Sequence, residues 1–193
     1  GQGKAGLFAQ NCALAKFDDV RILGTDAFEE GFAAAPFGRW EDQGAAWRTD
    51  TKARRRVTTA TGTGLTVAGD AEWREYTFSA EAKPAGAEAV GLVFGYQGPE
   101  RYCLFRVPCP AGKAQIVRVQ AGKESVLGES LRPVEARDGM RLAVDLHDGL
   151  VRGLVDGALA AGAAEPSGCA GRIGFWARGE AGAGFGSAGA EFR

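Results

Sequence analysis

Histidine is nearly absent from this sequence, with one residue among 193, and the four cysteines include no Cys-x-x-Cys spacing. Zinc sites in proteins combine His and Cys ligands at such spacings, so the sequence does not favour one. Long apolar runs are also missing, and none approaches the roughly 20 residues that a membrane-spanning helix needs. Apolar residues at helical spacing do not continue beyond a turn or two, which argues against a fold of long helices.

The sequence has no excess of either charge. Its 23 Lys and Arg residues are balanced by 24 Asp and Glu residues, and the basic residues form no stripe. Nucleic acid and anionic membrane surfaces are therefore poor candidate partners. The one dense basic patch, Arg54 to Arg56, precedes Val57-Thr58-Thr59, and we interpret it as the exposed start of a strand.

Turn residues and alternating segments are abundant. The 30 glycines are spread along the chain, as expected where tight turns are frequent. Residues 75–81 and 141–146 alternate polar and apolar side chains, which is typical of half-buried strands. Turns are expected at 121–123, at His147-Asp148-Gly149 and at Asp156-Gly157. The regular spacing predicts an all-β fold, an antiparallel two-sheet β-sandwich.

Strand alternation also assigns side chains to the two faces of each sheet, because successive side chains point to opposite sides. The side chains predicted to face the core are Tyr76, Phe78, Cys103, Phe105, Val107, Leu142, Val144, Leu146, Ile173 and Phe175. Four outward side chains, Tyr102, Arg106, Trp176 and Arg178, form a candidate ligand-binding surface on a concave sheet face. Aromatic rings beside arginines suit sugar rings, through apolar contact and directed hydrogen bonds. The alternative is ordinary packing of Trp176 under a neighbouring loop or domain.

The two ends of the sequence resemble each other. Residues 3–10 match residues 171–178 without a gap, and the offset of 168 residues continues to Phe17 and Phe185. Repeats of this size indicate tandem domains. We therefore expect residues 1–24 to be the last two strands of a preceding copy, or a segment that completes a domain. Residues 25–193 would then be one complete domain.

Several motifs resemble a known family in their order and spacing. They are Val90-Gly91-Leu92-Val93-Phe94, Tyr102-Cys103-Leu104-Phe105-Arg106, Gly153-Leu154-Val155-Asp156-Gly157 and Gly171-Arg172-Ile173-Gly174-Phe175. Together they resemble the core of concanavalin A-like domains, including the laminin-G-like modules and the 3-keto-disaccharide hydrolase domain family of bacteria. The resemblance extends over most of residues 26–185 and implies a jelly-roll topology.

The resemblance also bears on metal binding. Related jelly rolls often close with Phe-Asp-Asp-Val, which occurs here at Phe17-Asp18-Asp19-Val20, and the acidic pair can lie near a structural Ca²⁺. Asp18 and Asp19 are therefore candidate Ca²⁺ ligands, although such a site needs several converging oxygens. The alternative is a solvated strand end. The second copy has Phe185-Gly186-Ser187-Ala188 instead and lacks these carboxylates.

No catalytic cluster is visible in the sequence. Glu75 and Glu81 would lie about 20 Å apart on a straight strand, too far apart for the paired carboxylates of a glycosidase. His147 falls in a turn, where a hydrogen-bonding role is expected. The four cysteines allow two disulfides or none, and Cys103 could pair with Cys109 only if the chain turned near Pro108.

We therefore predict a non-catalytic module that binds carbohydrate or neighbouring protein domains. Because the chain begins with Gly1 rather than Met, we expect it to be processed, proteolysed or cut from a longer chain. We expect the module to belong to a larger protein outside the cell or in the cell envelope. Two alternatives stay open. One is a sugar-processing enzyme similar to the 3-keto-glycoside hydrolases, and the other is a purely structural tandem repeat in an assembly.

Overall fold

The computed structural model describes residues 27–32, 40–58, 62–164 and 169–192, and every structural statement below concerns these residues. They form strands, turns and loops, and none of them lies in a helix. No described segment is accordingly a helix long and apolar enough to cross a membrane. The prediction of an all-β antiparallel sandwich is confirmed. The predicted division between residues 1–24 and 25–193 falls outside the described residues and stays a prediction.

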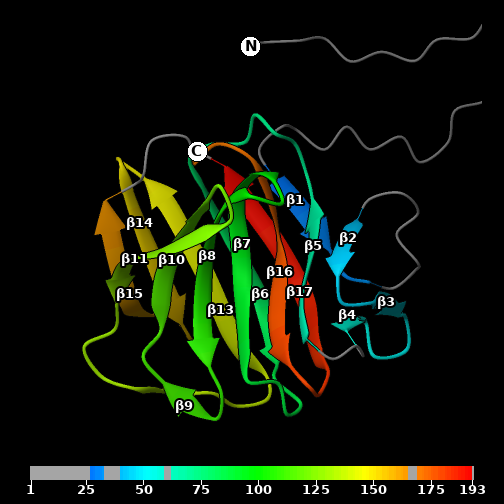
Figure 1. Ribbon diagram of the computed structural model, residues 1–193. Coiled ribbons are helices and arrows are strands. Elements are labelled where there is room, and N and C mark those ends of the chain that lie inside the picture. The colour runs from blue at the N-terminus through cyan, green and yellow to red at the C-terminus, as the bar shows by residue number, and fades with distance from the viewer. Residues whose placement is uncertain (1–26, 33–39, 59–61, 165–168, 193) are drawn as a thin grey trace, which may run out of the picture.

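Two antiparallel sheets face each other (Figure 1). The front sheet has the strand order β11 (Lys123–Glu129), β10 (Gln115–Gln120), β8 (Arg101–Pro108), β7 (Ala89–Gly98), β16 (Arg172–Gly179), β5 (Gly62–Ala68), β2 (Glu41–Gly44). The back sheet has the order β15 (Ala158–Ala164), β14 (Leu150–Val155), β13 (Met140–His147), β6 (Tyr76–Lys83), β17 (Ala183–Phe192), β4 (Arg55–Thr58), β3 (Trp47–Asp50), with β1 (Ala27–Glu30) also paired to β17. A small third sheet pairs β12 (Val134–Glu135) with β9 (Ala111–Gly112).

Three of the hairpins use two-residue turns whose residues both have positive φ. They are Ala121-Gly122 (φ 50° and 72°), Asp148-Gly149 (56° and 69°) and Asp156-Gly157 (50° and 80°). This is the pattern of type I′ turns, whose twist matches that of the flanking strands, and Asp and Gly tolerate it best. All three turns lie where the sequence predicted them. The first two are one residue shorter than expected, because β11 already begins at Lys123 and β13 extends to His147.

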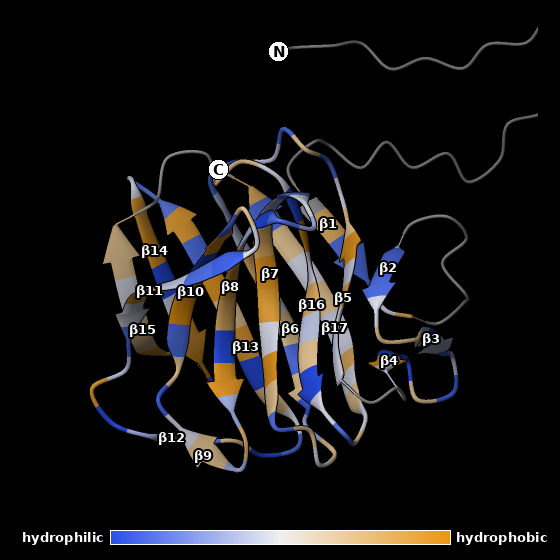
Figure 2. Cartoon of the chain, viewed as in Figure 1, coloured by the Kyte–Doolittle hydropathy of each residue, from blue (hydrophilic) through white to orange (hydrophobic). Residues whose placement is uncertain are grey.

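The core fills the space between the two sheets. All ten side chains predicted to face inward expose 5% of their surface or less. Phe175 lies at the centre, stacked on Phe185 with ring centroids 4.6 Å apart and on Trp40 at 4.8 Å. In Figure 2 the central strand β7 is largely apolar whereas the edge strand β11 is polar, and β7 is accordingly buried over most of its length. Burying a Phe side chain contributes about 2 kcal/mol.

One ion pair crosses between the sheets. Arg56 on β4 donates to the Asp42 carboxylate on β2, and Thr66 Oγ1 on β5 donates to the same carboxylate at 2.6 Å. The Arg56 side chain is 9% exposed and that of Asp42 35%. A strand does begin at Arg55, as the sequence predicted, but the expectation of an exposed patch is wrong for Arg56. Strand alternation points this side chain to the interior, where Asp42 neutralises it.

Candidate functional site

The four predicted ligand-binding side chains share the outer face of the front sheet. Tyr102 and Arg106 lie on β8, and Trp176 and Arg178 lie on β16; β7 runs between these two strands. In the register, Gly91 of β7 lies opposite both Arg106 and Trp176. Arg106, Gly91 and Trp176 therefore form one row across the sheet.

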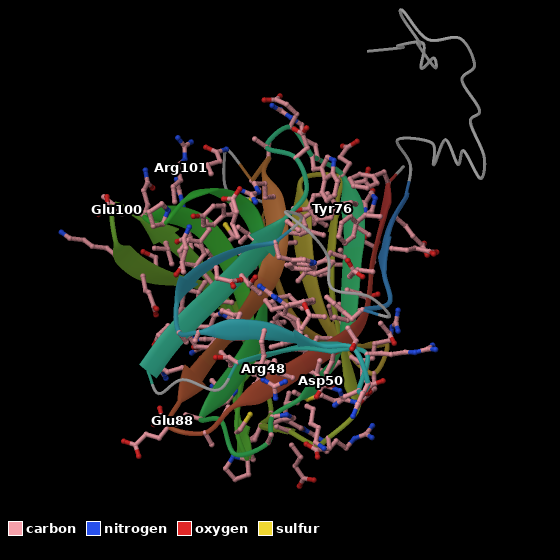
Figure 3. All side chains as sticks on the ribbon, turned by 90° about the vertical axis from the view of Figure 1, so that its right-hand side faces the viewer. Arg48, Asp50, Tyr76, Glu88, Glu100 and Arg101 are labelled. Carbon is pink, nitrogen blue, oxygen red and sulfur yellow. The ribbon has the colours of Figure 1, made fainter. Side chains whose placement is uncertain are left out.

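The other two side chains lie on opposite sides of this row. Both β8 and β16 pair antiparallel with β7, so they run in the same direction. Tyr102 precedes Arg106 by four residues, and Arg178 follows Trp176 by two. At about 3.3 Å per residue, the surface extends roughly 20 Å along the strands. Figure 3 views the sandwich from the side of β2 and β3, with Glu100 and Arg101 at one end and Glu88, the partner of Arg178, towards the other.

The floor of this face is an apolar cluster separate from the core. Its members are Leu65, Val67, Ala89, Val93, Tyr96, Leu104, Val117 and Trp176, with Tyr102 packed against them. None of the eight exposes more than 7% of its surface, and Trp176 exposes 2%. Such a floor on the outside of a sheet was not predicted. The Trp176 ring packs into the floor and does not project into solvent.

Two glycines allow the strands of the floor to lie close together. A Cβ atom added at Gly91 would lie 2.4 Å from the Phe105 carbonyl oxygen, and one at Gly174 would lie 2.1 Å from the Thr66 carbonyl oxygen. Both distances are far below any contact that real Cβ atoms make, and both obstacles are backbone atoms. A glycine inside an apolar strand is the sequence signal for such a close approach.

Charged and polar side chains surround the floor as a rim. Arg106 donates to Gln115 Oε1 at 3.0 Å and to Glu124 Oε2 at 2.8 Å. At the far side, Arg172 donates to Glu41 Oε2 at 2.8 Å.

The aromatic residues of the face take part in this rim. Gln43 donates to the Tyr96 hydroxyl. The Arg178 guanidinium lies 5.8 Å from the centre of the Trp176 ring, within the range of a cation–π contact, and its Nε is 3.6 Å from Glu88. The Trp176 ring therefore has a cation above it.

The three rim carboxylates, Glu41, Glu88 and Glu124, were missed by sequence reasoning. Each is engaged by an arginine. The signal that could have found Glu124 is the turn at 121–122. A two-residue hairpin places Glu124 opposite Val119, whose other neighbour is Tyr102. Glu41 could not be found in this way, since β2 and its neighbour β5 are not joined by a short hairpin.

The surroundings of the rim shift two pKa values. The hydrogen bond from Arg172 lowers the pKa of the Glu41 carboxyl, which therefore stays ionised at neutral pH. Burial raises the pKa of the Tyr102 hydroxyl, with a further contribution from the nearby Glu124 carboxylate. Tyr102 thus stays a neutral donor and acceptor. The face offers guanidinium donors, carboxylate acceptors and a phenol above an apolar floor, which are the groups that hydrogen-bond sugar hydroxyls.

A second candidate is a hollow of about 390 Å³ on the outer face of the back sheet. Its polar lining residues include Glu29, Thr77, Ser79, Arg141, Ser187 and Glu191. Arg141 crosses between strands and donates to Ser79 Oγ at 2.7 Å. None of the four residues predicted to form the ligand-binding surface lines this hollow.

Beside the hollow, Asp145 on β13 is the centre of a hydrogen-bond network. It accepts from Thr77 Oγ1 and from Arg152, each at 3.0 Å, and is hydrogen-bonded to Nδ1 of His147. Burial acts to raise the pKa of Asp145, but the hydrogen bonds from His147, Thr77 and Arg152 outweigh it and lower the pKa. His147 lies directly before the Asp148-Gly149 turn and is hydrogen-bonded, as expected of a turn residue.

The metal prediction concerns Asp18 and Asp19, which lie outside the described residues. Over the ranges that the structure describes, no group of three or more His, Cys, Asp or Glu side chains could hold a metal ion. A Ca²⁺ site at Asp18 and Asp19 therefore stays a prediction.

The sequence matches no protein-family model and no curated protein. Solved structures, in contrast, resemble the fold over most of its length. The carbohydrate-binding module CBM66 of Bacillus subtilis superposes with a TM-score of 0.68 at 17% identity, covering 79% of this chain and 94% of the other. The β-glucanase of Bacillus licheniformis gives a TM-score of 0.62 at 14% identity, covering 87% and 98%. The carbohydrate recognition domain of Emp47p gives 0.59 at 16% identity, covering 86% and 94%.

These likenesses, all under 20% identical, define the class of fold. The chain is an all-β jelly-roll sandwich of the kind found in carbohydrate-binding modules, lectin-like domains and glucanases. The resemblance to concanavalin A-like domains is supported at this level. The narrower resemblances to the laminin-G-like modules and to the 3-keto-disaccharide hydrolase domain stay predictions.

Proposed function

We propose that this domain binds carbohydrate on the outer face of its front sheet, as a non-catalytic module of a larger secreted or cell-envelope protein. The observation that carries the proposal is the row of Arg106, Gly91 and Trp176, which places a guanidinium beside an apolar floor. The names of the similar structures add support, since CBM66 is a carbohydrate-binding module and the Emp47p domain a carbohydrate recognition domain.

Each part of the face has a separate role in this proposal. The apolar C–H face of a sugar ring contacts the half-buried ring of Tyr102, which the floor supports from below. Sugar hydroxyls accept hydrogen bonds from Arg106 and donate to Glu124, which hold each other in position at 2.8 Å. Arg178 is the more adaptable group, because its side chain is 48% exposed, whereas that of Arg106 is only 14% exposed.

Trp176 has an indirect role in binding. With 2% of its surface exposed, its ring offers little area to a ligand. It fills the floor between β7 and β5 and holds Arg178 above the ring by the cation–π contact. A ligand therefore meets Arg178 before it meets the indole.

A glycan array followed by calorimetric titration of each hit tests the proposal. Replacing Arg106→Gln removes the charge that contacts Glu124, and we expect the dissociation constant to rise about tenfold or more, as for loss of a charge-assisted hydrogen bond. Arg141→Ala on the back sheet is the matched control, and we expect its affinity to equal that of the wild type. Loss of binding in Arg141→Ala alone would move the site to the back-sheet hollow.

The same samples test the alternatives. If the domain releases product from native or 3-keto glycosides, and Arg106→Gln abolishes this activity, the front face is a catalytic site rather than a binding site. Failure to bind any glycan, together with binding to a neighbouring protein domain, would favour a protein-binding or structural module in an assembly.

A further inference from the structure

Two cysteines that are distant in the sequence meet in the core. Cys103 on β8 and Cys169, shortly before β16, are separated by 66 residues, and their sulfur atoms lie 3.3 Å apart. Cys103 exposes 5% of its surface and Cys169 exposes 3%. A separation of 3.3 Å brings the two sulfurs within a small side-chain rotation of bonding distance.

The backbone on both sides of the pair is fixed. Cys103 lies opposite Phe94 of β7, where the register between β7 and β8 shifts. The next residue, Gly95, has φ 56°, and a Cβ atom there would lie 2.6 Å from the carbonyl oxygen of Cys169. On the other side of Cys169, the Gly171 amide donates to the Trp73 carbonyl at 3.0 Å. The segment that carries Cys169 is thus packed directly against the strand next to Cys103.

We propose that Cys103 and Cys169 are a disulfide-forming pair, oxidised by a small-molecule disulfide such as oxidised glutathione. One thiolate attacks the small disulfide, forms a mixed disulfide and releases one small thiolate. The second protein thiolate then attacks the mixed disulfide, the protein disulfide forms, and a second small thiolate leaves. The two protein thiols lose two electrons and two protons, and the small disulfide is reduced to two thiols.

Burial of both sulfurs sets when this reaction takes place. An oxidant reaches them during folding or when residues 169–171 move away from β7, and only slowly in the closed domain. The product links the front-sheet strand β8 to the connection between β15 and β16, which joins the two sheets. A disulfide of this kind is expected in an oxidising compartment, and the inference does not depend on carbohydrate binding.

Cys109 is not the partner. Its thiol donates weakly to the Val107 carbonyl at 3.7 Å. It follows Cys103 by six residues at the end of β8, about 20 Å along an extended strand. The fourth cysteine, Cys12, lies outside the described residues, so the experiment has to include it.

The test refolds the full chain with reduced and oxidised glutathione, blocks remaining thiols and maps the peptides without reductant. We expect a cross-linked peptide pair containing Cys103 and Cys169, with Cys109 alkylated. Closing a loop of this length should raise Tm by roughly 10 °C, a gain that reductant removes. Cys103→Ser and Cys169→Ser should each abolish the reductant-sensitive shift, and Cys109→Ser should leave it unchanged.

Two results would overturn the inference. One is full alkylation of Cys103 and Cys169 in the refolded chain, and the other is a cross-link from either of them to Cys12 or Cys109. The peptide map is made on the unchanged chain, so it decides the question even if a serine variant does not fold.

Discussion

Replacing Asp42 by alanine leaves the Arg56 guanidinium inside the sandwich without its counter-charge. The side chain of Arg56 is 9% exposed, and after the substitution its described hydrogen-bond partner is the Thr49 hydroxyl at 3.2 Å. Thr66 also loses its acceptor. Breaking a buried ion pair costs about 3 to 5 kcal/mol. Since the Asp42 side chain is 35% exposed and water can enter there, we expect about 2 to 3 kcal/mol.

Urea titration of the wild type and Asp42→Ala, analysed by linear extrapolation, measures this difference. For a domain of this size it corresponds to a decrease in Tm of roughly 5–10 °C. The control is Glu72→Ala, whose carboxylate lies 4.0 Å from Arg74 in a pair with side-chain exposures of 85% and 69%. Exposed pairs of this kind contribute at most about 1 kcal/mol. Equal losses of stability in Asp42→Ala and Glu72→Ala would refute the argument that the buried Arg56 charge is stabilised by Asp42.

A double variant separates two effects: the loss of the attraction between Arg56 and Asp42, and the cost of a buried arginine charge without its carboxylate. Asp42→Leu combined with Arg56→Met removes both charges and keeps apolar volume. Replacing buried pairs in this way is often neutral, so the double variant should be more stable than Asp42→Ala. A double variant less stable than the single one would mean that the ion pair itself contributes net stability.

Two further predictions concern the glycines of the floor and the network around Asp145. Gly174→Ala should destabilise the domain by about 3 kcal/mol, because the added Cβ would lie 2.1 Å from a backbone oxygen. Gly98→Ala on β7, where an added Cβ meets no atom within 4 Å, should change the stability by less than about 0.5 kcal/mol. Thermal unfolding compares the two variants, and an unchanged Tm in Gly174→Ala would contradict the close approach of the strands. The folded-state pKa of Asp145 is lowered, so its stabilisation is fully present above its unfolded pKa of about 4 and is lost as pH falls through the folded value. In Asp145→Asn the loss of stability between about pH 5 and pH 2 should therefore be smaller than in the wild type. Urea titrations at several pH values measure the free energy of unfolding, and an equal dependence on pH in the two proteins would count against the network.

Local patterns predicted the strands, the turns and the side of each sheet that a residue faces. Alternation placed Tyr76 and Phe78 inside because the side-chain period of a strand is fixed. Asp148-Gly149 and Asp156-Gly157 were found because few residues tolerate positive φ. The same parity placed Tyr102, Arg106, Trp176 and Arg178 on one face, which the strand register of the structure reproduces.

Features that depend on strand order could not be predicted in this way. The pairing of β17 with β1, β4 and β6, or of β5 with β16, brings together segments far apart in the sequence. The contact between Cys103 and Cys169 and the ion pair of Arg56 with Asp42 depend on that order. Burial of Trp176 on an outer face also needs the neighbours that β5 and β7 supply, since alternation shows only that the ring leaves the core.

The most direct test of the central claim is a nuclear magnetic resonance titration of the isotope-labelled domain with a glycan selected on the array. If the sugar lies on the front face, the shifts should concentrate on the amides of Gly91 and residues 102–106 and on the Trp176 indole N–H. The amide signals of Thr77, Ser79 and Arg141 on the back sheet should not shift. Shifts confined to those three residues, with an unchanged front face, would contradict the account.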